Sequence, residues 1–136
     1  MTLFMNPCEE SYRRLGYDKA PCYVTWSAEN RSQLIRIPAA AGEYRRAELR
    51  SADPTANPYI AYALLIYAGM YGLEHDLQLC PASDFNVYAA PAEVLSGLKK
   101  LPGSLYEAAA LAGASAFISK HLPETVISAY RHRCEA

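Results

Sequence analysis

The segment RRAELRS, residues 45–51, decides the fold of this chain because charged and apolar side chains alternate along it. In a β-strand, successive side chains point to opposite faces of the sheet. Arg46, Glu48 and Arg50 therefore share one face of the predicted strand, while the alanine and the leucine between them share the other. The sequence thus predicts a strand with one strongly charged face.

A second strand is predicted at SQLIRIP, residues 32–38, and it ends at a proline. The two strands are joined by a loop centred on Gly42, which indicates an antiparallel hairpin. Arg36 then projects from the same face as the charged residues of the other strand. The opposite face is expected to pack on the core through its apolar side chains, Ile35, Ile37, Ala47 and Leu49.

The other elements are predicted from periodicity and from turn residues. The β-branched and aromatic segment 22–27 indicates a further strand, and residues 1–21 are expected to be irregular. Helices are predicted at about 58–73, 91–99, 104–120 and 124–133, and Ser104 with Glu107 has the spacing of a capping box. Residues 58–73 are apolar nearly all round, so this helix is expected to be buried on most sides. The order of strands and then helices gives an α+β fold in isolation, or one end of a larger α/β barrel.

The length, net charge and cysteine spacing of the chain exclude several classes of protein. The chain has 136 residues, which suits a single domain, and a net charge of -1, which gives no reason to expect a nucleic acid or anionic membrane partner. The longest apolar run is shorter than a membrane span needs. Cys8, Cys22, Cys80 and Cys134 lack the spacing of a zinc site and are expected to be reduced thiols in a cytoplasmic protein.

The charged face has two interpretations. Charge on the open side of an antiparallel sheet is common, so the face can simply be solvated. However, it carries three arginines and one glutamate, and arginine is suited to bidentate contacts with carboxylate and phosphate. A single Glu48 is a poor ion-pair partner for all three arginines but a suitable ligand for a divalent cation that bridges phosphates. This second interpretation predicts a site for an anionic substrate and a nucleotide with magnesium.

Four segments of the chain read NPCEESYRRLG, VTWSAENRSQLIRIPAA, RRAELRSADPTANPYIAYALLIYAG and LPGSLYEA. In this order they resemble the C-terminal catalytic segment of glutamine synthetase, and the resemblance covers residues 6–133. It implies a piece of a barrel-type catalytic domain in a ligase that joins ammonia to glutamate with ATP. The reaction passes through γ-glutamyl phosphate, and the metal is Mg²⁺ or Mn²⁺.

The resemblance also implies roles for individual residues. Arg14, Arg31 and Arg50 match family arginines that bind the glutamate substrate, and Arg31 and Arg50 also act at the reacting centre. Arg31, Arg36 and Arg46 match contacts to the nucleotide phosphates, and Glu48 matches a metal ligand.

The sequence departs from the family pattern in the loop GYDKAP, where Asp18 stands near a family glutamate that helps to bind ammonium. This departure leaves open a related ligase that attaches glutamate to another amine, such as a polyamine. Tyr88 falls near a tyrosine that some bacterial members adenylylate, although the sequence around it differs. The three histidines have no ligand spacing.

The resemblance implies a family enzyme of roughly three times this length. The N-terminal β-grasp domain and most metal-binding acids have no counterpart here, so the isolated chain is expected to be an inactive fragment of an oligomeric enzyme. Unpaired strand edges and an exposed side of the 58–73 helix predict that the fragment itself associates. A non-catalytic interaction module is the remaining alternative.

Overall fold

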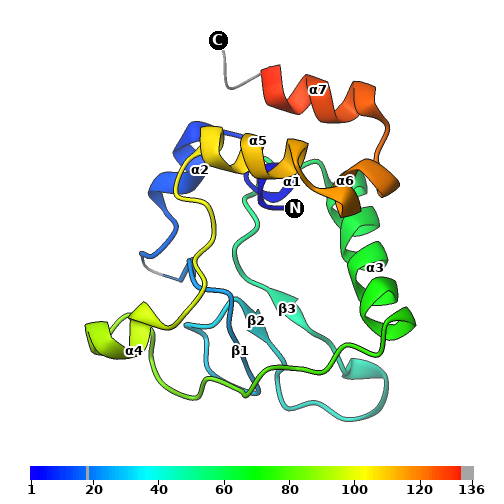
Figure 1. Cartoon of the computed structure of the whole chain (residues 1–136). Helices are drawn as coiled ribbons and strands as arrows, with labels where there is room; N and C mark the ends of the chain where they lie inside the picture. The colour runs from blue at the N-terminus through cyan, green and yellow to red at the C-terminus, as the bar shows by residue number, and fades with distance from the viewer. Residues whose placement is uncertain (18, 133–136) are drawn as a thin grey trace. The chain divides into compact units, whose positions relative to one another are not determined.

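The computed structural model describes residues 1–17 and 19–132 (Figure 1). These residues contain seven α-helices, one short 3₁₀-helix and three short strands. They form two compact units, the first built from residues 1–12, 52–79 and 102 onward, and the second from residues 13–51 and 80–101. The α+β class predicted from the sequence, a small sheet followed by helices, is confirmed.

The first unit is helical. Its helices are α1 (Thr2–Met5), α3 (Pro58–Glu74), α5 (Leu105–Gly113), α6 (Ala116–His121) and α7 (Glu124–His132), and α2 (Glu9–Arg13) begins in it. The core lies where α1 and α7 pack on α5. Phe4 of α1 is fully buried, and its ring centroid lies 4.9 Å from that of Tyr130 in α7.

The expectation that residues 1–21 are irregular is wrong. Leu3, Phe4 and Met5 are buried in α1, and α2 follows after Asn6 and Pro7. Helices this short are marginal on their own, and tertiary packing stabilises them. A segment of four or five residues also carries too little periodicity to be recognised from the sequence.

Helix α3 begins as the sequence predicts but is not buried as expected. The side chain of Asn57 accepts hydrogen bonds from the backbone N–H groups of Tyr59 and Ile60, and Pro58 occupies the first turn. Of all the residues in α3, Leu64 alone is buried. The expectation of burial on most sides is therefore wrong, because the short helices of this unit cover one face of α3 and leave the other open.

The predicted helix at 104–120 is two helices. Ser104 caps α5 by accepting a hydrogen bond from the backbone N–H of Glu107 at 3.1 Å, as the sequence predicts. The helix stops after Gly113, and Ser115 caps α6 through a hydrogen bond of 3.3 Å from the backbone N–H of Ile118. A second capping serine inside the apolar run thus splits it into two segments.

The second unit carries the sheet and α4 (Ala92–Ser96), which is shorter than the predicted 91–99 helix. The strands are β1 (Trp26–Ser27), β2 (Ile35–Arg36) and β3 (Glu48–Leu49), in the order β1-β2-β3. Strands β2 and β3 pair antiparallel, so the predicted hairpin is confirmed, while β1 pairs with β2 in parallel. Each strand is only two residues long, much shorter than predicted.

The hairpin register places Arg36 opposite Glu48 and Ile35 opposite Leu49. The two faces therefore alternate as predicted. However, Ile35 and Leu49 are only half-buried and Ile37 is 40% exposed, so the expectation of a buried apolar face is wrong for these residues. The connecting loop contains the 3₁₀-helix Gly42–Tyr44, where Gly42 adopts a φ of 59° that favours glycine.

Residues 80–101 run beside β1 and support the loop between β1 and β2. The backbone N–H of Ser83 donates to the carbonyl of Trp26 at 2.8 Å. The side chains of Asn30 and Gln33 both donate to the carbonyl of Phe85, at 2.8 and 2.7 Å. These bonds fix the loop that carries Arg31.

None of the helices in the described residues combines the length and the hydropathy that a bilayer crossing requires. Cys8, Cys22 and Cys80 carry free thiols, and Cys134 lies outside the described residues.

Candidate functional site

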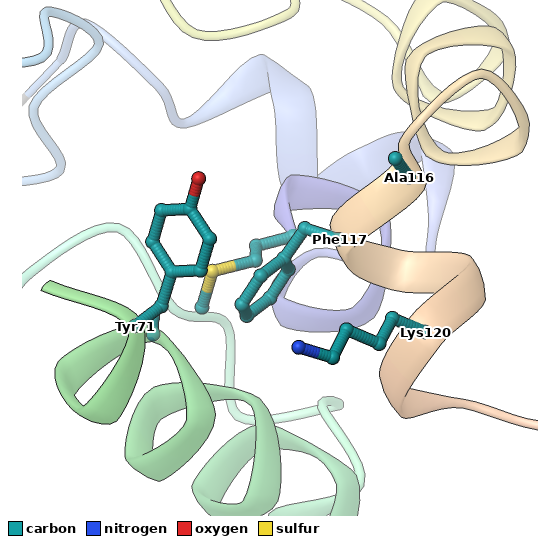
Figure 2. Close-up of a pocket in the computed structure, with 6 residues that line it drawn as sticks. Tyr71, Ala116, Phe117 and Lys120 are labelled. Atoms are coloured by element: carbon teal, nitrogen blue, oxygen red, sulfur yellow. The ribbon is translucent and has the colours of Figure 1, made fainter. Parts of the chain in front are cut away.

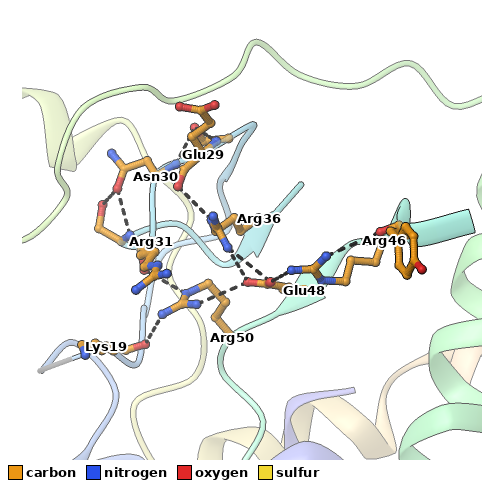
Figure 3. Close-up of polar contacts among 11 residues, drawn as sticks. Lys19, Glu29, Asn30, Arg31, Arg36, Arg46, Glu48 and Arg50 are labelled. Atoms are coloured by element: carbon orange, nitrogen blue, oxygen red, sulfur yellow. Dashed lines mark hydrogen bonds and ion pairs between the residues drawn. The ribbon is translucent and has the colours of Figure 1, made fainter. Parts of the chain in front are cut away.

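The carboxylate of Glu48 is the centre of a cluster of arginines, which Figure 3 shows. Arg36 donates to both of its oxygens through one nitrogen, at 3.2 and 3.0 Å. Arg46 donates to Oε1 at 3.2 Å, and Arg50 forms an ion pair with Oε2 at 3.6 Å. All four residues named as a charged face in the sequence are thus brought together, and we call them the arginine cluster.

The hairpin explains why these side chains meet. Arg36 and Glu48 are directly opposed in the antiparallel register, so their side chains leave the same face at the shortest cross-strand distance. Arg46 and Arg50 lie two residues to either side of Glu48 and therefore point the same way.

Two arginines of the cluster are also held by backbone carbonyls. Nε of Arg36 donates to the carbonyl of Glu29 at 2.8 Å. Nε of Arg50 donates to the carbonyl of Arg31 at 2.8 Å, and its Nη2 donates to that of Lys19 at 3.4 Å. These carbonyl acceptors were missed in the sequence, because a backbone oxygen gives no residue-type signal.

The four side chains differ in exposure. Arg36 and Arg50 are 16% and 15% exposed and Glu48 is 27% exposed, whereas Arg46 is 55% exposed. Hydrogen bonding from Arg36 is the main reason why the pKa of Glu48 lies below its ordinary value, and Arg46 adds to the effect while burial opposes it. Glu48 is therefore a carboxylate at neutral pH.

The ion pairing of Glu48 differs from the expectation. Glu48 was expected to be a poor ion-pair partner for three arginines, yet it contacts all three. Both carboxylate oxygens are shared, which the hairpin geometry permits. Three guanidinium groups and one carboxylate leave the cluster with two excess positive charges. The guanidinium of Arg46 is the most exposed of the three.

Arg31 and Arg14 lie at the edge of the cluster. Arg31 is exposed, and it follows Asn30, whose Oδ1 accepts hydrogen bonds from the backbone N–H and the hydroxyl of Ser32 at 2.9 Å each. Arg14 donates to the backbone carbonyl of Ser51, the residue after Arg50. The structure thus gathers most of the sequence-predicted arginines in one part of the second unit.

Residues 1–135 match the family model described as the glutamine synthetase catalytic domain. The chain belongs to this family. A glutamine synthetase from Methanosarcina mazei is 41% identical over 133 residues, which are 95% of this chain and 30% of that protein. A glutamine synthetase from Staphylococcus epidermidis is 43% identical over 111 residues, 79% of this chain and 25% of that protein.

A solved structure described as the GmaS/ADP complex has the same fold, with a TM-score of 0.81 and 28% sequence identity. It covers 96% of this chain, and the match spans 30% of the GmaS chain. This chain therefore spans about a quarter to a third of the length of the glutamine synthetase relatives and of the GmaS chain.

The described residues offer few ligands for a metal ion. Glu48 is a hard oxygen ligand, but residues 1–17 and 19–132 contain no group of three His, Cys, Asp or Glu side chains placed to hold a metal. Divalent magnesium needs several oxygen ligands. The cluster therefore fits a phosphate anion through its arginines, and a metal ion only with Glu48 as one ligand among others.

The sequence singled out two further positions, Asp18 and Tyr88. Asp18, placed near a family glutamate, lies outside the described residues. Tyr88 is 40% exposed and lines a cavity of about 540 Å³ together with Tyr17, Cys22 and Tyr23. Burial raises the pKa of the Cys22 thiol.

Proposed function

We propose that this chain supplies the phosphate- and substrate-binding wall of a glutamine synthetase. The reaction is the ATP-dependent formation of glutamine from glutamate and ammonia through γ-glutamyl phosphate, in glutamine biosynthesis and nitrogen metabolism. The observation that carries the proposal is the arginine cluster, which has excess positive charge and lies in a chain of the glutamine synthetase catalytic-domain family.

The arginines are assigned by their contacts and exposure. Arg46 and Arg36 bind the nucleotide phosphates, and the exposure of Arg46 supports this role because it leaves much of the guanidinium free for an anion. Arg31 and Arg50 bind glutamate and stabilise the transferring phosphoryl group, helped by the hydrogen bond that ties Arg50 to the carbonyl of Arg31. Arg14 is assigned to glutamate from the family pattern.

Glu48 is proposed as one ligand of Mg²⁺ or Mn²⁺. When bound, the ion would neutralise phosphate charge during phosphoryl transfer. Because Glu48 now contacts three arginines, it has to exchange part of these contacts when it holds the ion, and phosphate oxygens are suitable new acceptors for the released guanidinium groups. The ADP named with the GmaS structure supports a nucleotide at this family site.

Several wider features belong to the same proposal. The two compact units form one catalytic domain, because the family match crosses both. The enzyme acts as a homo-oligomer in the cytoplasm, where thiols such as Cys8 and Cys22 stay reduced. With Glu48 as its single metal ligand, the chain by itself is expected to form no glutamine.

The test is a chimera in which this chain replaces the matching segment of the Methanosarcina mazei relative, with which it aligns over 133 residues. The chimera is expected to form glutamine, measured directly together with ADP release, with ammonia preferred over polyamines. Arg50→Ala should lower kcat about 100- to 1,000-fold, as the loss of other transition-state donors does. Arg46→Ala should mainly raise the KM for ATP.

Glu48→Ala should abolish most turnover in the chimera, and excess Mn²⁺ should not restore it. The matched control is Arg45→Ala, because Arg45 is an exposed arginine that directly precedes Arg46 at the end of the 3₁₀-helix. An active chimera that tolerates both Glu48→Ala and Arg50→Ala would contradict the proposal. Preference for a polyamine would instead support the related amine ligase.

A further inference from the structure

Each compact unit is held by a different kind of side chain. In the first unit, Figure 2 shows Tyr71 of α3 and Phe117 of α6 facing each other across a cavity of about 420 Å³, and their rings meet edge to face at 6.0 Å. In the second unit, the connection between β1 and β2 is held by hydrogen bonds between polar side chains and residues 84–87. We call this connection, residues 28–34, the Arg31 loop. Polar groups are costly to bury unless they are paired, so these bonds indicate a requirement for a fixed loop.

Asn30 lies at the centre of the Arg31 loop, and both ends of its carboxamide are paired (Figure 3). Its Oδ1 accepts hydrogen bonds from the backbone N–H and the hydroxyl of Ser32, at 2.9 Å each, which closes a turn around Arg31. Its Nδ2 donates to the carbonyl of Phe85 at 2.8 Å. The side chain of Asn30 therefore shapes the loop from within and also anchors it to a neighbouring segment.

The anchor of the loop is buried. Gln33 is fully buried, and its Nε2 donates to the same carbonyl of Phe85 at 2.7 Å. Ser32 is 5% exposed, and its hydroxyl accepts a hydrogen bond from the backbone N–H of Val87 at 3.1 Å. Arg31 thus stands between two residues, Asn30 and Ser32, whose side chains are both fixed to residues 85–87. Because Arg31 is itself exposed, its position depends on this backbone.

The loop also supplies acceptors for two arginines of the cluster. The carbonyl of Arg31 accepts from Nε of Arg50, and the carbonyl of Glu29 accepts from Nε of Arg36, at 2.8 Å each. Arg36 is held independently by Glu48 at 3.0 and 3.2 Å, whereas Arg50 lies 3.6 Å from that carboxylate. A shift of the loop backbone is therefore expected to displace Arg50 more than Arg36.

We propose that Asn30 is a positioning residue for the reaction, which holds Arg31 directly and Arg50 through the carbonyl of Arg31. This role rests on the proposed function, because it concerns the two arginines assigned there to glutamate and to the transferring phosphoryl group. Phosphoryl transfer depends mainly on positioned charge, and a misplacement of about 1 Å can lower a rate roughly 100-fold. Asn30 itself contacts no substrate in this role.

The chemistry of the carboxamide explains why asparagine suits this position. The two sets of bonds require an acceptor and a donor on one short side chain, which asparagine provides. Aspartate would keep the acceptor but turn a negative charge toward the carbonyl of Phe85. Serine would keep an acceptor for the turn but is too short to reach that carbonyl. Asn30→Ser therefore removes the anchor alone, and Asn30→Ala removes the anchor and the turn.

Activity is tested in the chimera with the Methanosarcina mazei relative described above. Asn30→Ala should lower kcat about 10- to 100-fold with little change in the KM for ATP, because Arg46 lies outside the loop. Asn30→Ser should lose less. The matched control is Ser96→Ala, since Ser96 is an exposed residue of the same unit whose hydroxyl donates to the carbonyl of Glu93 at 2.8 Å. This control should keep full activity.

A double-mutant cycle separates positioning from a general structural role. If Asn30 acts through Arg31 and Arg50, its loss should matter less once one of these arginines is already absent. The combined loss of kcat in Asn30→Ala/Arg50→Ala should therefore be smaller than the product of the two single losses by at least about threefold. The same is expected for Asn30→Ala/Arg31→Ala. Losses that simply multiply in both cycles would contradict the positioning role.

The chain by itself gives a readout that needs no turnover. The backbone amide of Ser32 donates to Oδ1 of Asn30, so it should be protected from hydrogen exchange in the wild-type chain. Asn30→Ala should accelerate this exchange about tenfold or more, whereas Ser96→Ala should not change it. If Asn30→Ala fails to fold, Asn30→Ser takes its place in the chimera and in the cycle.

The outcomes distinguish this inference from the proposed function. An active chimera that loses activity with Arg50→Ala but keeps it with Asn30→Ala and Asn30→Ser overturns the positioning role alone. A chimera that tolerates Arg50→Ala contradicts the proposed function and the positioning role together. Rapid exchange of the Ser32 amide in the wild-type chain would show that the turn around Arg31 does not persist in solution, which also overturns the inference.

Discussion

The β2–β3 hairpin and helix α3 have opposite compositions, and their exposures are the reverse of what composition suggests. Arg36 and Arg50 in the charged hairpin are 16% and 15% exposed, whereas Tyr59 and Leu73 in the apolar helix are 85% and 79% exposed. The arginines have carboxylate and carbonyl acceptors in neighbouring segments. The helix has packing partners on one side only. Burial thus follows the partners that the fold supplies rather than the polarity of the segment.

The largest effect is expected inside α3 itself, between two residues one half-turn apart. Leu64→Ala should lower the free energy of unfolding by about 2–5 kcal/mol, because Leu64 is fully buried and its loss leaves a cavity. Ile66→Ala should change it by no more than about 0.5 kcal/mol. Urea denaturation at submicromolar concentration, where association contributes little, measures both. Equal losses would show that the open face of α3 is covered in the folded monomer.

An intermediate effect is expected when two arginines of the cluster are compared. Arg36→Ala should destabilise the chain by roughly 1–3 kcal/mol, because the carboxylate of Glu48 and the carbonyl of Glu29 each lose a hydrogen-bond donor. Arg46→Ala should cost about 0–1 kcal/mol, since Arg46 is mostly exposed. Thermal or urea unfolding of the two variants checks the order. The reverse order would mean that the hairpin opens in solution.

The smallest effect is the acid dependence of stability. The pKa of Glu48 is lowered from its ordinary value of 4.5 in the folded chain, mainly by the hydrogen bond from Arg36. The resulting stability is fully present above that value and is lost as the pH falls through the lowered pKa. Urea unfolding of the wild type and of Glu48→Gln should therefore differ by a constant amount above about pH 5 and converge as the pH falls through the lowered pKa of Glu48. A gap that widens on acidification would contradict the ion pairs.

The sequence predicted those elements that depend on residues close together in the chain. The alternation around Glu48 gave the hairpin and its charged face, and Ser104 with Glu107 gave the start of α5. It did not predict α1, because Leu3 and Phe4 become a core only through helices that lie about a hundred residues later. It also did not predict the parallel pairing of β1 with β2, which depends on supports from residues 80–101.

For the candidate site, side-chain pattern was enough to group Arg36, Arg46, Glu48 and Arg50. It was not enough to predict how their charges are balanced, because that depends on both oxygens of Glu48 being reachable in the folded hairpin. The roles of Arg14 and Arg31 in binding glutamate come from the family pattern and stay predictions. Geometry places them beside the cluster through the carbonyls of Ser51 and Arg31.

The contacts of Arg50 also bear on the order in which the chain folds. Its guanidinium reaches the carbonyls of Lys19 and Arg31, which precede it by 31 and 19 residues. Contacts that close long loops have to wait until the entropy of closure is offset by others, so we expect them to form after the rate-limiting step. Arg50→Ala should then accelerate unfolding while leaving the refolding rate nearly unchanged, a division that stopped-flow kinetics measures. The contacts of the arginine cluster would in that case form late in folding and slow the unfolding of the second unit.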